Sequence, residues 1–164
     1  MPAPPLPPRD AFRWSCEVEV RFRDLDAMGH VNNAAYLTYF EIARTGYMRA
    51  LGHAPEGERD PAVLFPFILA EISCRYLSPA RLGDRLAVAL RTVRAGSKSF
   101  EFEYLVSRGD GEPVAAGRSV QICFDYRERR SVAMPPPLRE RLERLEGRAL
   151  SDPGAGSRSG GRTE

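Results

Sequence analysis

The stretch between positions 21 and 36 holds the polar groups of this chain that are best suited to chemistry. These groups are two carboxylates, an imidazole and two amides, belonging to Asp24, Asp26, His30, Asn32 and Asn33. A carboxylate can attack a carbonyl carbon or activate water as a general base. Backbone N–H groups at the start of a helix have no partner within the helix and can stabilise an oxyanion. The stretch therefore indicates acyl-transfer chemistry if a helix starts just after the carboxylates.

The same residue types also have a structural interpretation. Asp and Asn before a helix commonly cap its first turn or form the preceding loop. His30 has two interpretations as well, because its side chain can order the loop through the backbone or exchange a proton near neutral pH. Residue types alone leave the choice between a capped helix start and a catalytic loop open.

A strand and a helix are predicted on the two sides of this stretch. Residues 16–22 alternate between apolar and polar side chains, which predicts a half-buried strand. Beyond a polar turn that contains Gly29, apolar residues recur at spacings of three and four through residues 36–51, which predicts a helix. Asn32 or Asn33 is expected to cap the start of that helix, and Gly52 to end it.

The second half of the chain changes to strand patterning. The predicted strands have period two and occupy residues 64–77, 85–93, 100–106 and 120–126. The last two are expected to pair antiparallel across a Gly-Asp-Gly turn at 109–111. One strand, one long helix and then about four strands predict an α+β fold in which an antiparallel sheet packs on the helix.

The length of 164 residues is typical of one domain with one core. We expect a Pro-rich disordered tail at 1–13, a folded domain at 14–148 and a second disordered tail at 149–164. Pro135–Pro137 should end the sheet, and a short C-terminal helix is predicted from leucines at 138, 142 and 145.

Composition excludes several classes of protein. The net charge is only +2, Lys98 is the only lysine, and acidic residues are interleaved with arginines, so nucleic acid is not expected as a partner. Three cysteines and two histidines without ligand spacing indicate reduced thiols and no metal. Neither an apolar run of about 20 residues nor a secretory signal is visible, so we expect a cytoplasmic protein with no membrane partner.

A family resemblance sharpens these expectations. Residues 24–36 read DLDAMGHVNNAAY and have the form D-x-D-x-x-G-H-V-N-N-x-x-Y. The segment resembles the signature of the 4-hydroxybenzoyl-CoA thioesterase family of the hot-dog superfamily. The resemblance extends from Val18 to Leu142 through Ser78-Pro79, Gly83-Asp84 and the Gly-Ser-Lys-Ser stretch at 96–99. It implies a hot-dog fold, in which an antiparallel sheet wraps around one long helix, and hydrolysis of an acyl-CoA thioester without a cofactor.

The resemblance also implies roles for individual residues. Asp26 takes the position of the catalytic carboxylate, as nucleophile or general base, and the N–H of Asn33 takes that of the oxyanion donor. Some relatives carry a histidine where this chain has Asn33, and whether His30 replaces it stays open. Gly29 and Tyr36 are expected to contact substrate.

Two other acidic residues of the region have alternative roles. Asp24 is expected to be structural and to accept hydrogen bonds from loop N–H groups. Another hot-dog branch has its catalytic carboxylate on the helix, which makes Glu41 the second candidate, although Glu41 and Arg44 are spaced to form an ion pair.

Several functions and assemblies are compatible with this site. The alternatives are an acyl-carrier-protein thioesterase with the same site and a non-catalytic acyl-CoA-binding protein, which would not need Asp26. A dehydratase fits less well, because it needs a histidine paired with a carboxylate across the site. Hot-dog relatives pair sheets edge to edge and place the site at the subunit boundary, so a homodimer or homotetramer is expected.

Overall fold

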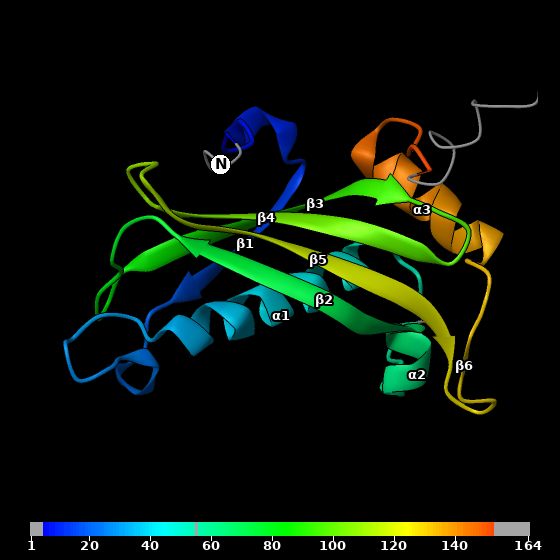
Figure 1. Cartoon of the computed structure of the whole chain (residues 1–164), viewed down its shortest axis with the longest axis horizontal. Helices are drawn as coiled ribbons and strands as arrows, with labels where there is room; N and C mark the ends of the chain where they lie inside the picture. The colour runs from blue at the N-terminus through cyan, green and yellow to red at the C-terminus, as the bar shows by residue number, and fades with distance from the viewer. Residues whose placement is uncertain (1–4, 55, 153–164) are drawn as a thin grey trace, which may run out of the picture.

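A computed structural model describes residues 5–54 and 56–152 of the chain (Figure 1). A six-stranded sheet consists of β1 (Trp14–Glu19), β2 (Phe67–Tyr76), β3 (Arg85–Ala95), β4 (Ser99–Arg108), β5 (Pro113–Asp125) and β6 (Arg130–Ser131). The helices are α1 (Asn33–Ala50), α2 (Pro61–Leu64) and α3 (Pro136–Glu146), and short 3₁₀ turns form at Arg9–Ala11 and Phe22–Asp24. Within these described ranges no helix combines the length and the apolar character that a membrane span needs.

The strand order is β1-β3-β4-β5-β2, every neighbouring pair is antiparallel, and β6 pairs with the end of β5. The long helix α1 runs along one face of the curved sheet (Figure 1). The predicted α+β fold, with an antiparallel sheet around one long helix, is confirmed, as is the antiparallel pairing of residues 100–106 with the following strand.

The core forms where α1 packs against the centre of the sheet. Tyr39, Phe40 and Tyr47 of α1 are fully buried, and the ring of Phe40 stacks on that of Tyr104 with centroids 4.3 Å apart. Gly117 of β5 permits this close approach, because a Cβ there would lie 2.5 Å from the Phe40 ring. A helix and a sheet packed this closely give the start of α1 a fixed position.

The helix boundaries follow the predicted signals, whereas two strand boundaries differ. Asn32 caps α1 by accepting a hydrogen bond from the N–H of Ala34, and Gly52, with φ +60°, follows its last turn. β1 ends at Glu19, before the 3₁₀ turn, so Phe22 is 81% exposed instead of lying on the buried face. Leu64, expected in a strand, belongs to the short helix α2, which is capped by Asp60.

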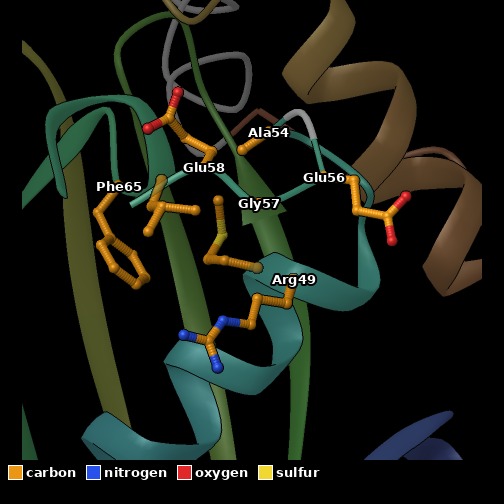
Figure 2. Close-up of a pocket in the computed structure, with 8 residues that line it drawn as sticks. Arg49, Ala54, Glu56, Gly57, Glu58 and Phe65 are labelled. Carbon is orange, nitrogen blue, oxygen red and sulfur yellow. The ribbon is translucent and has the colours of Figure 1, made fainter. Parts of the chain in front are cut away.

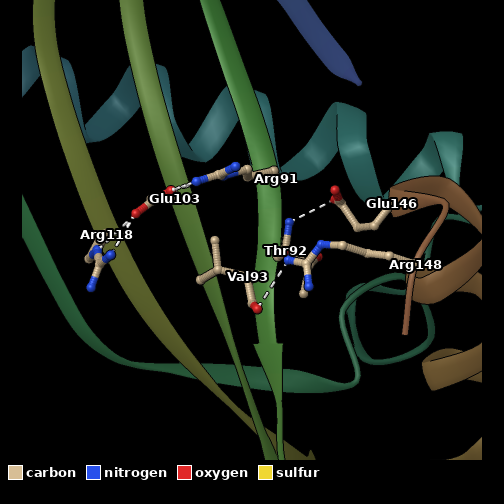
Figure 3. Close-up of polar contacts among 7 residues, drawn as sticks. All are labelled: Arg91, Thr92, Val93, Glu103, Arg118, Glu146 and Arg148. Carbon is tan, nitrogen blue, oxygen red and sulfur yellow. Dashed lines mark hydrogen bonds and ion pairs between the residues drawn. The ribbon is translucent and has the colours of Figure 1, made fainter. Parts of the chain in front are cut away.

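Side chains of α3 and the residues after it cover part of the β3 edge. β1 pairs only with residues 85–90 of β3. Further along β3, the N–H of Thr92 donates to the Glu146 carboxylate (2.7 Å), and Arg148 donates to the carbonyl of Val93 (3.2 Å) (Figure 3). These contacts satisfy backbone groups at a bulge that would otherwise form an open edge.

A charged cluster on the sheet joins the strands β3, β4 and β5. Glu103 of β4 accepts hydrogen bonds from Arg91 of β3 and from Arg118 of β5, both at 2.6 Å (Figure 3). Burial raises the pKa of Glu103, but the two guanidinium groups outweigh that effect and the pKa lies below its usual value. The Arg91 guanidinium also lies 5.2 Å from the centre of the Phe12 ring, which ties the N-terminal segment to the sheet.

Parts of both expected tails lie on the domain. Residues 5–13 include the first 3₁₀ turn and Phe12, and Leu150 is only 5% exposed. Ser151 accepts a hydrogen bond from the N–H of Ala95 (3.1 Å), which extends the edge contacts of β3. The contact of Phe12 with Arg91 and the burial of Leu150 place parts of both expected tails against the domain. The other residues of the expected tails, 1–4 and 153–164, lie outside the described ranges.

Candidate active site

The loop between the 3₁₀ turn and α1 is a tight turn around Asp26. The N–H of Asp26 donates to the carbonyl of His30 (2.8 Å), and the N–H of Gly29 donates to the carbonyl of Asp26 (3.1 Å). Gly29 has φ +76°, and a Cβ at this position would meet no atom within 4 Å. Glycine is therefore favoured here by the backbone angle and not by lack of space. Gly29 thus lies in the polar turn that the sequence predicts between the first strand and the helix.

The Asp26 side chain is half-buried and has one oxygen engaged in this turn. Its Oδ1 accepts hydrogen bonds from the N–H of Met28 (2.8 Å) and of His30 (3.4 Å). No residue within the described ranges donates a hydrogen bond to its Oδ2. Because the backbone fixes Oδ1, the carboxylate is oriented while its second oxygen keeps its capacity to react.

Asp24, two residues earlier, is enclosed by donors. Its carboxylate accepts from the backbone N–H of Arg21 (2.9 Å), from the Arg21 guanidinium (3.0 Å) and from the hydroxyl of Tyr39 (3.0 Å). Burial pushes its pKa up, but these hydrogen bonds outweigh burial and the pKa lies below its usual value. The predicted hydrogen bond from a loop N–H to Asp24 is confirmed.

The start of α1 places a backbone donor beside this loop. Asn33 is the first residue of the helix and is exposed. Its N–H donates to no acceptor within the described ranges, whereas its carbonyl accepts a hydrogen bond from the hydroxyl of Tyr76 (3.1 Å). The N–H of Val31 donates to the carbonyl of Ala80 (2.9 Å), which fixes the loop to the turn after β2. The backbone N–H of Asn33 is thus held in place and can donate a hydrogen bond to an oxyanion.

Other residues expected at the site lie in different surroundings. His30 is half-buried, and its backbone N–H and carbonyl make contacts that order the loop, whereas its ring has no hydrogen bond to any residue that the structure describes. Tyr36, expected to contact substrate, is only 2% exposed and packs edge-on against the rings of Tyr39 and Tyr76. The structure thus places Tyr36 in the core, because the helix turns its side chain toward the sheet. Gly29 is exposed at the loop tip.

The second candidate carboxylate lies away from this turn. Glu41 is exposed two turns into α1. Its spacing to Arg44 suited an ion pair, but Arg44 instead donates to the hydroxyl of Tyr104 (3.2 Å). Within the described ranges no salt bridge orients Glu41.

Tyr76 contacts the start of α1, and the sequence pattern does not reveal this contact. It ends β2, is 45% exposed, and contacts Asn33, which lies 43 positions earlier in the chain. A strand pattern of period two gives the face of a side chain but not its distant partner. Only the sheet order, which places β2 at one edge, shows this contact.

The protonation of the thiols decides whether a cysteine could act as a nucleophile. All three are free, and burial raises the pKa of Cys74 and of Cys123 to about 11 each. Both thiols are therefore protonated at neutral pH. In the part of the chain that the structure describes, no three His, Cys, Asp or Glu residues gather as metal ligands would.

Comparisons with known proteins identify the family to which this chain is similar. The family model of the thioesterase-like superfamily matches residues 20–142. The long-chain acyl-CoA thioesterase FadM of Escherichia coli is 28% identical over 130 residues, which cover 79% of this chain and 96% of that protein. A chloroplastic acyl-acyl carrier protein thioesterase of Arabidopsis thaliana is also 28% identical, over 77% of this chain and 66% of that protein. A solved thioesterase of Thermus thermophilus, complexed with coenzyme A and Zn, has a TM-score of 0.75 and 38% identity, covering 86% and 99% of the two chains.

Proposed function

Because this chain belongs to the thioesterase-like superfamily, we propose that it hydrolyses an acyl-CoA thioester with Asp26 as the catalytic carboxylate. One observation carries the choice of Asp26. Its Oδ1 is held by the N–H of Met28 while no described residue donates to Oδ2, and the loop leads directly into the available amide of Asn33. Asp24 is excluded as the reacting group, because donors enclose its carboxylate.

The reaction follows from these two groups. The thioester carbonyl oxygen accepts a hydrogen bond from the N–H of Asn33, which stabilises the negative charge that develops on it. Asp26 then either attacks the carbonyl carbon or removes a proton from the water that attacks it. In the first route the C–S bond breaks, an acyl-aspartyl anhydride forms and water hydrolyses it. In both routes coenzyme A leaves as the thiolate, and the products are the free acid and CoA.

The edges of the sheet support a dimer through β2. The edge strand β1 has six residues and carries Glu17 and Glu19, charges that discourage pairing with another chain. β2 has ten residues and presents exposed Ile68, Leu69 and Tyr76. A long edge strand with apolar side chains pairs readily with an identical strand. We therefore assign β2 to the subunit boundary, next to the Tyr76–Asn33 contact.

The dimer is tested by light scattering at micromolar concentration. We expect at least twice the mass of one chain, and Leu69→Lys on β2 should shift the population toward monomer with loss of activity. A wild-type enzyme that is monomeric and fully active would contradict this assignment.

The cellular location that we propose is the cytoplasm, supported by the free thiols, which are typical of a reducing compartment.

A panel of acyl-CoA substrates tests the activity itself. Release of free CoA is followed with a thiol reagent for aliphatic and aromatic acyl groups of increasing size. Parallel reactions with the same acyl groups on an acyl carrier protein decide between the two carriers, since one relative acts on such substrates. We expect faster release from CoA. Binding of acyl-CoA without release of CoA would instead indicate a non-catalytic binding protein.

A further inference from the structure

The segment that follows β2, residues 77–80, supports the loop that leads into α1. At one end of the segment, the N–H of Leu77 donates to the carbonyl of Val114 on β5 (2.9 Å). At the other end, the carbonyl of Ala80 accepts a hydrogen bond from the N–H of Val31 (2.9 Å), and both of these residues are buried. Backbone hydrogen bonds thus connect the sheet with the loop through this short segment.

Arg108, the last residue of β4, contacts the middle of the segment. Its guanidinium donates to the carbonyl of Pro79 (2.7 Å) and to the carboxylate of Glu112 (2.6 Å). Proline has no N–H, so the carbonyl is the one backbone group of Pro79 that a hydrogen bond can hold. Because β4 pairs with β3 on one side and with β5 on the other, Arg108 ties Pro79 to the interior of the sheet.

Val31 connects this segment to both groups of the proposed site. The residue before it, His30, accepts a hydrogen bond from the N–H of Asp26 at its carbonyl (2.8 Å). Two residues after Val31, Asn33 begins α1. A shift of Val31 would therefore change the separation between the Asp26 carboxylate and the N–H of Asn33.

The cavity at the C-terminal end of α1 lies away from these contacts (Figure 2). It has a volume of about 200 Å³, and its lining includes Arg49, Ala54 and Phe65. α1 has 18 residues, and at about 1.5 Å per residue its two ends lie about 27 Å apart. A substitution of Arg108 should therefore act on the start of α1 without changing this cavity.

We propose that Arg108 is a positioning residue for thioester hydrolysis. Through Pro79 and Val31 it holds the Asp26 carboxylate and the N–H of Asn33 at the separation that the reaction requires. The inference rests on the proposed function and deepens it. Within the described ranges Arg108 makes no hydrogen bond to Asp26 or Asn33, so it acts through the backbone between them. Misplacing a reacting group by about 1 Å can lower a rate about 100-fold, so a contact of this kind can limit turnover.

The first test removes the guanidinium and keeps a long side chain. Arg108→Met should lower kcat about tenfold and change KM less than about twofold, since substrate binding does not require the exact separation of the two groups. The matched control is Arg85→Met, which removes an exposed arginine paired with the exposed Glu17 and should keep the wild-type kcat. Wild-type kcat in Arg108→Met would overturn the inference, even with a lower free energy of unfolding. A raised KM with unchanged kcat would also overturn it, because Arg108 would then contact the substrate.

Arg108→Lys keeps the question decidable if Arg108→Met does not fold. Lysine retains the positive charge, but its compact ammonium group lacks the planar fork that reaches Pro79 and Glu112 together. We expect a folded protein, as judged by circular dichroism, with kcat about threefold below wild type and an unchanged KM. Wild-type kcat in Arg108→Lys would overturn the inference.

The closing experiment combines Arg108→Met with Asp26→Asn. If Arg108 acts by placing the carboxylate, its loss should matter little once the carboxylate is gone, and the residual kcat of Asp26→Asn should fall less than about twofold. A further tenfold loss would show an effect independent of Asp26 and would overturn the inference. Wild-type turnover in Asp26→Asn alone, or a wild-type enzyme that releases no CoA, would instead contradict the proposed function, so the two failures are distinguishable.

Discussion

The two ends of α1 are built in opposite ways. At the start, the N–H of Asn33 and one oxygen of Asp26 have no partner within the described ranges, and the surrounding loop is largely exposed. At the end, the hydroxyl of Tyr47 donates to the buried Glu146, and Arg141 donates to the carbonyl groups of Leu51 and Gly52. Polar groups are thus satisfied within the fold at one end of the helix and kept available at the other.

This difference separates residues that hold the fold from residues that can act. A buried polar group without a partner costs about 1–3 kcal/mol, so a polar group inside the domain is expected to be paired. At the exposed helix start, water or substrate can pair with Asn33 and Asp26 at little cost to the fold. Substitutions at the start should therefore reduce turnover more than stability, whereas substitutions at the end should do the reverse.

The largest expected effect is that of Asp26→Asn. The amide keeps the shape of the side chain and can still accept a hydrogen bond from the N–H of Met28, but it can neither attack nor remove a proton. We expect kcat to fall about 100-fold or more, with little change in the Kd of the substrate and in the melting temperature. Steady-state kinetics, binding of a slow substrate and circular dichroism measure these three quantities.

The matched control for this prediction is Glu41→Gln on the exposed face of α1, which should keep near-wild-type turnover. The opposite pattern, an active Asp26→Asn enzyme and an inactive Glu41→Gln enzyme, would move the catalytic carboxylate onto the helix. An unfolded Asp26→Asn protein would show that the turn requires Asp26 for folding, as a cap or loop anchor would.

Gly29→Val should act on the same end of the helix through the backbone. There is space for the side chain, but a β-branched residue is strained at φ +76°, so the turn that orients Asp26 should rearrange. We expect kcat/KM to fall at least about tenfold with limited loss of secondary structure. Gly83→Val is a matched control, since Gly83 also has positive φ and open space but lies in the turn before β3. Normal turnover in Gly29→Val would show that the loop is not tightly specified.

Glu146→Ala tests the other end of the helix. It leaves the hydroxyl of Tyr47 and the N–H of Thr92 without their carboxylate partner in the core. We expect the free energy of unfolding to fall by about 2–3 kcal/mol, measured by urea denaturation, while kcat at 25 °C stays close to the wild-type value. The control is Glu140→Ala, at an exposed position of α3, the helix that carries Glu146. It should change the free energy of unfolding by less than about 0.5 kcal/mol. A larger loss of turnover than of stability would contradict the separation of the two ends.

The sequence allowed the helix start to be predicted better than the helix end. Local signals mark the cap at Asn32 and the positive φ at Gly29, because each depends on a few adjacent residues. The hydrogen bond from Tyr47 to Glu146 joins positions that are 99 residues apart in the chain, and no local pattern encodes such a pair. The burial of Tyr36 was not predicted for a related reason, since the family motif gives its position in the chain but not the side of the helix that the sheet covers.

The smallest expected effect is a pH-dependent loss of stability in Asp24→Asn. Hydrogen bonds from Arg21 and Tyr39 hold the pKa of Asp24 below its unfolded value of about 3.9. A carboxylate with a lowered pKa stabilises the fold above the unfolded pKa, and this contribution is lost as the pH falls through the folded pKa. Because Arg21 is partly exposed, solvent screens the ion pair and the effect should be about 1 kcal/mol. The free energies of unfolding of wild type and variant should thus differ most above about pH 5 and converge below about pH 3, and a difference that grows toward acid would show that the carboxylate of Asp24 is not the group that stabilises the loop.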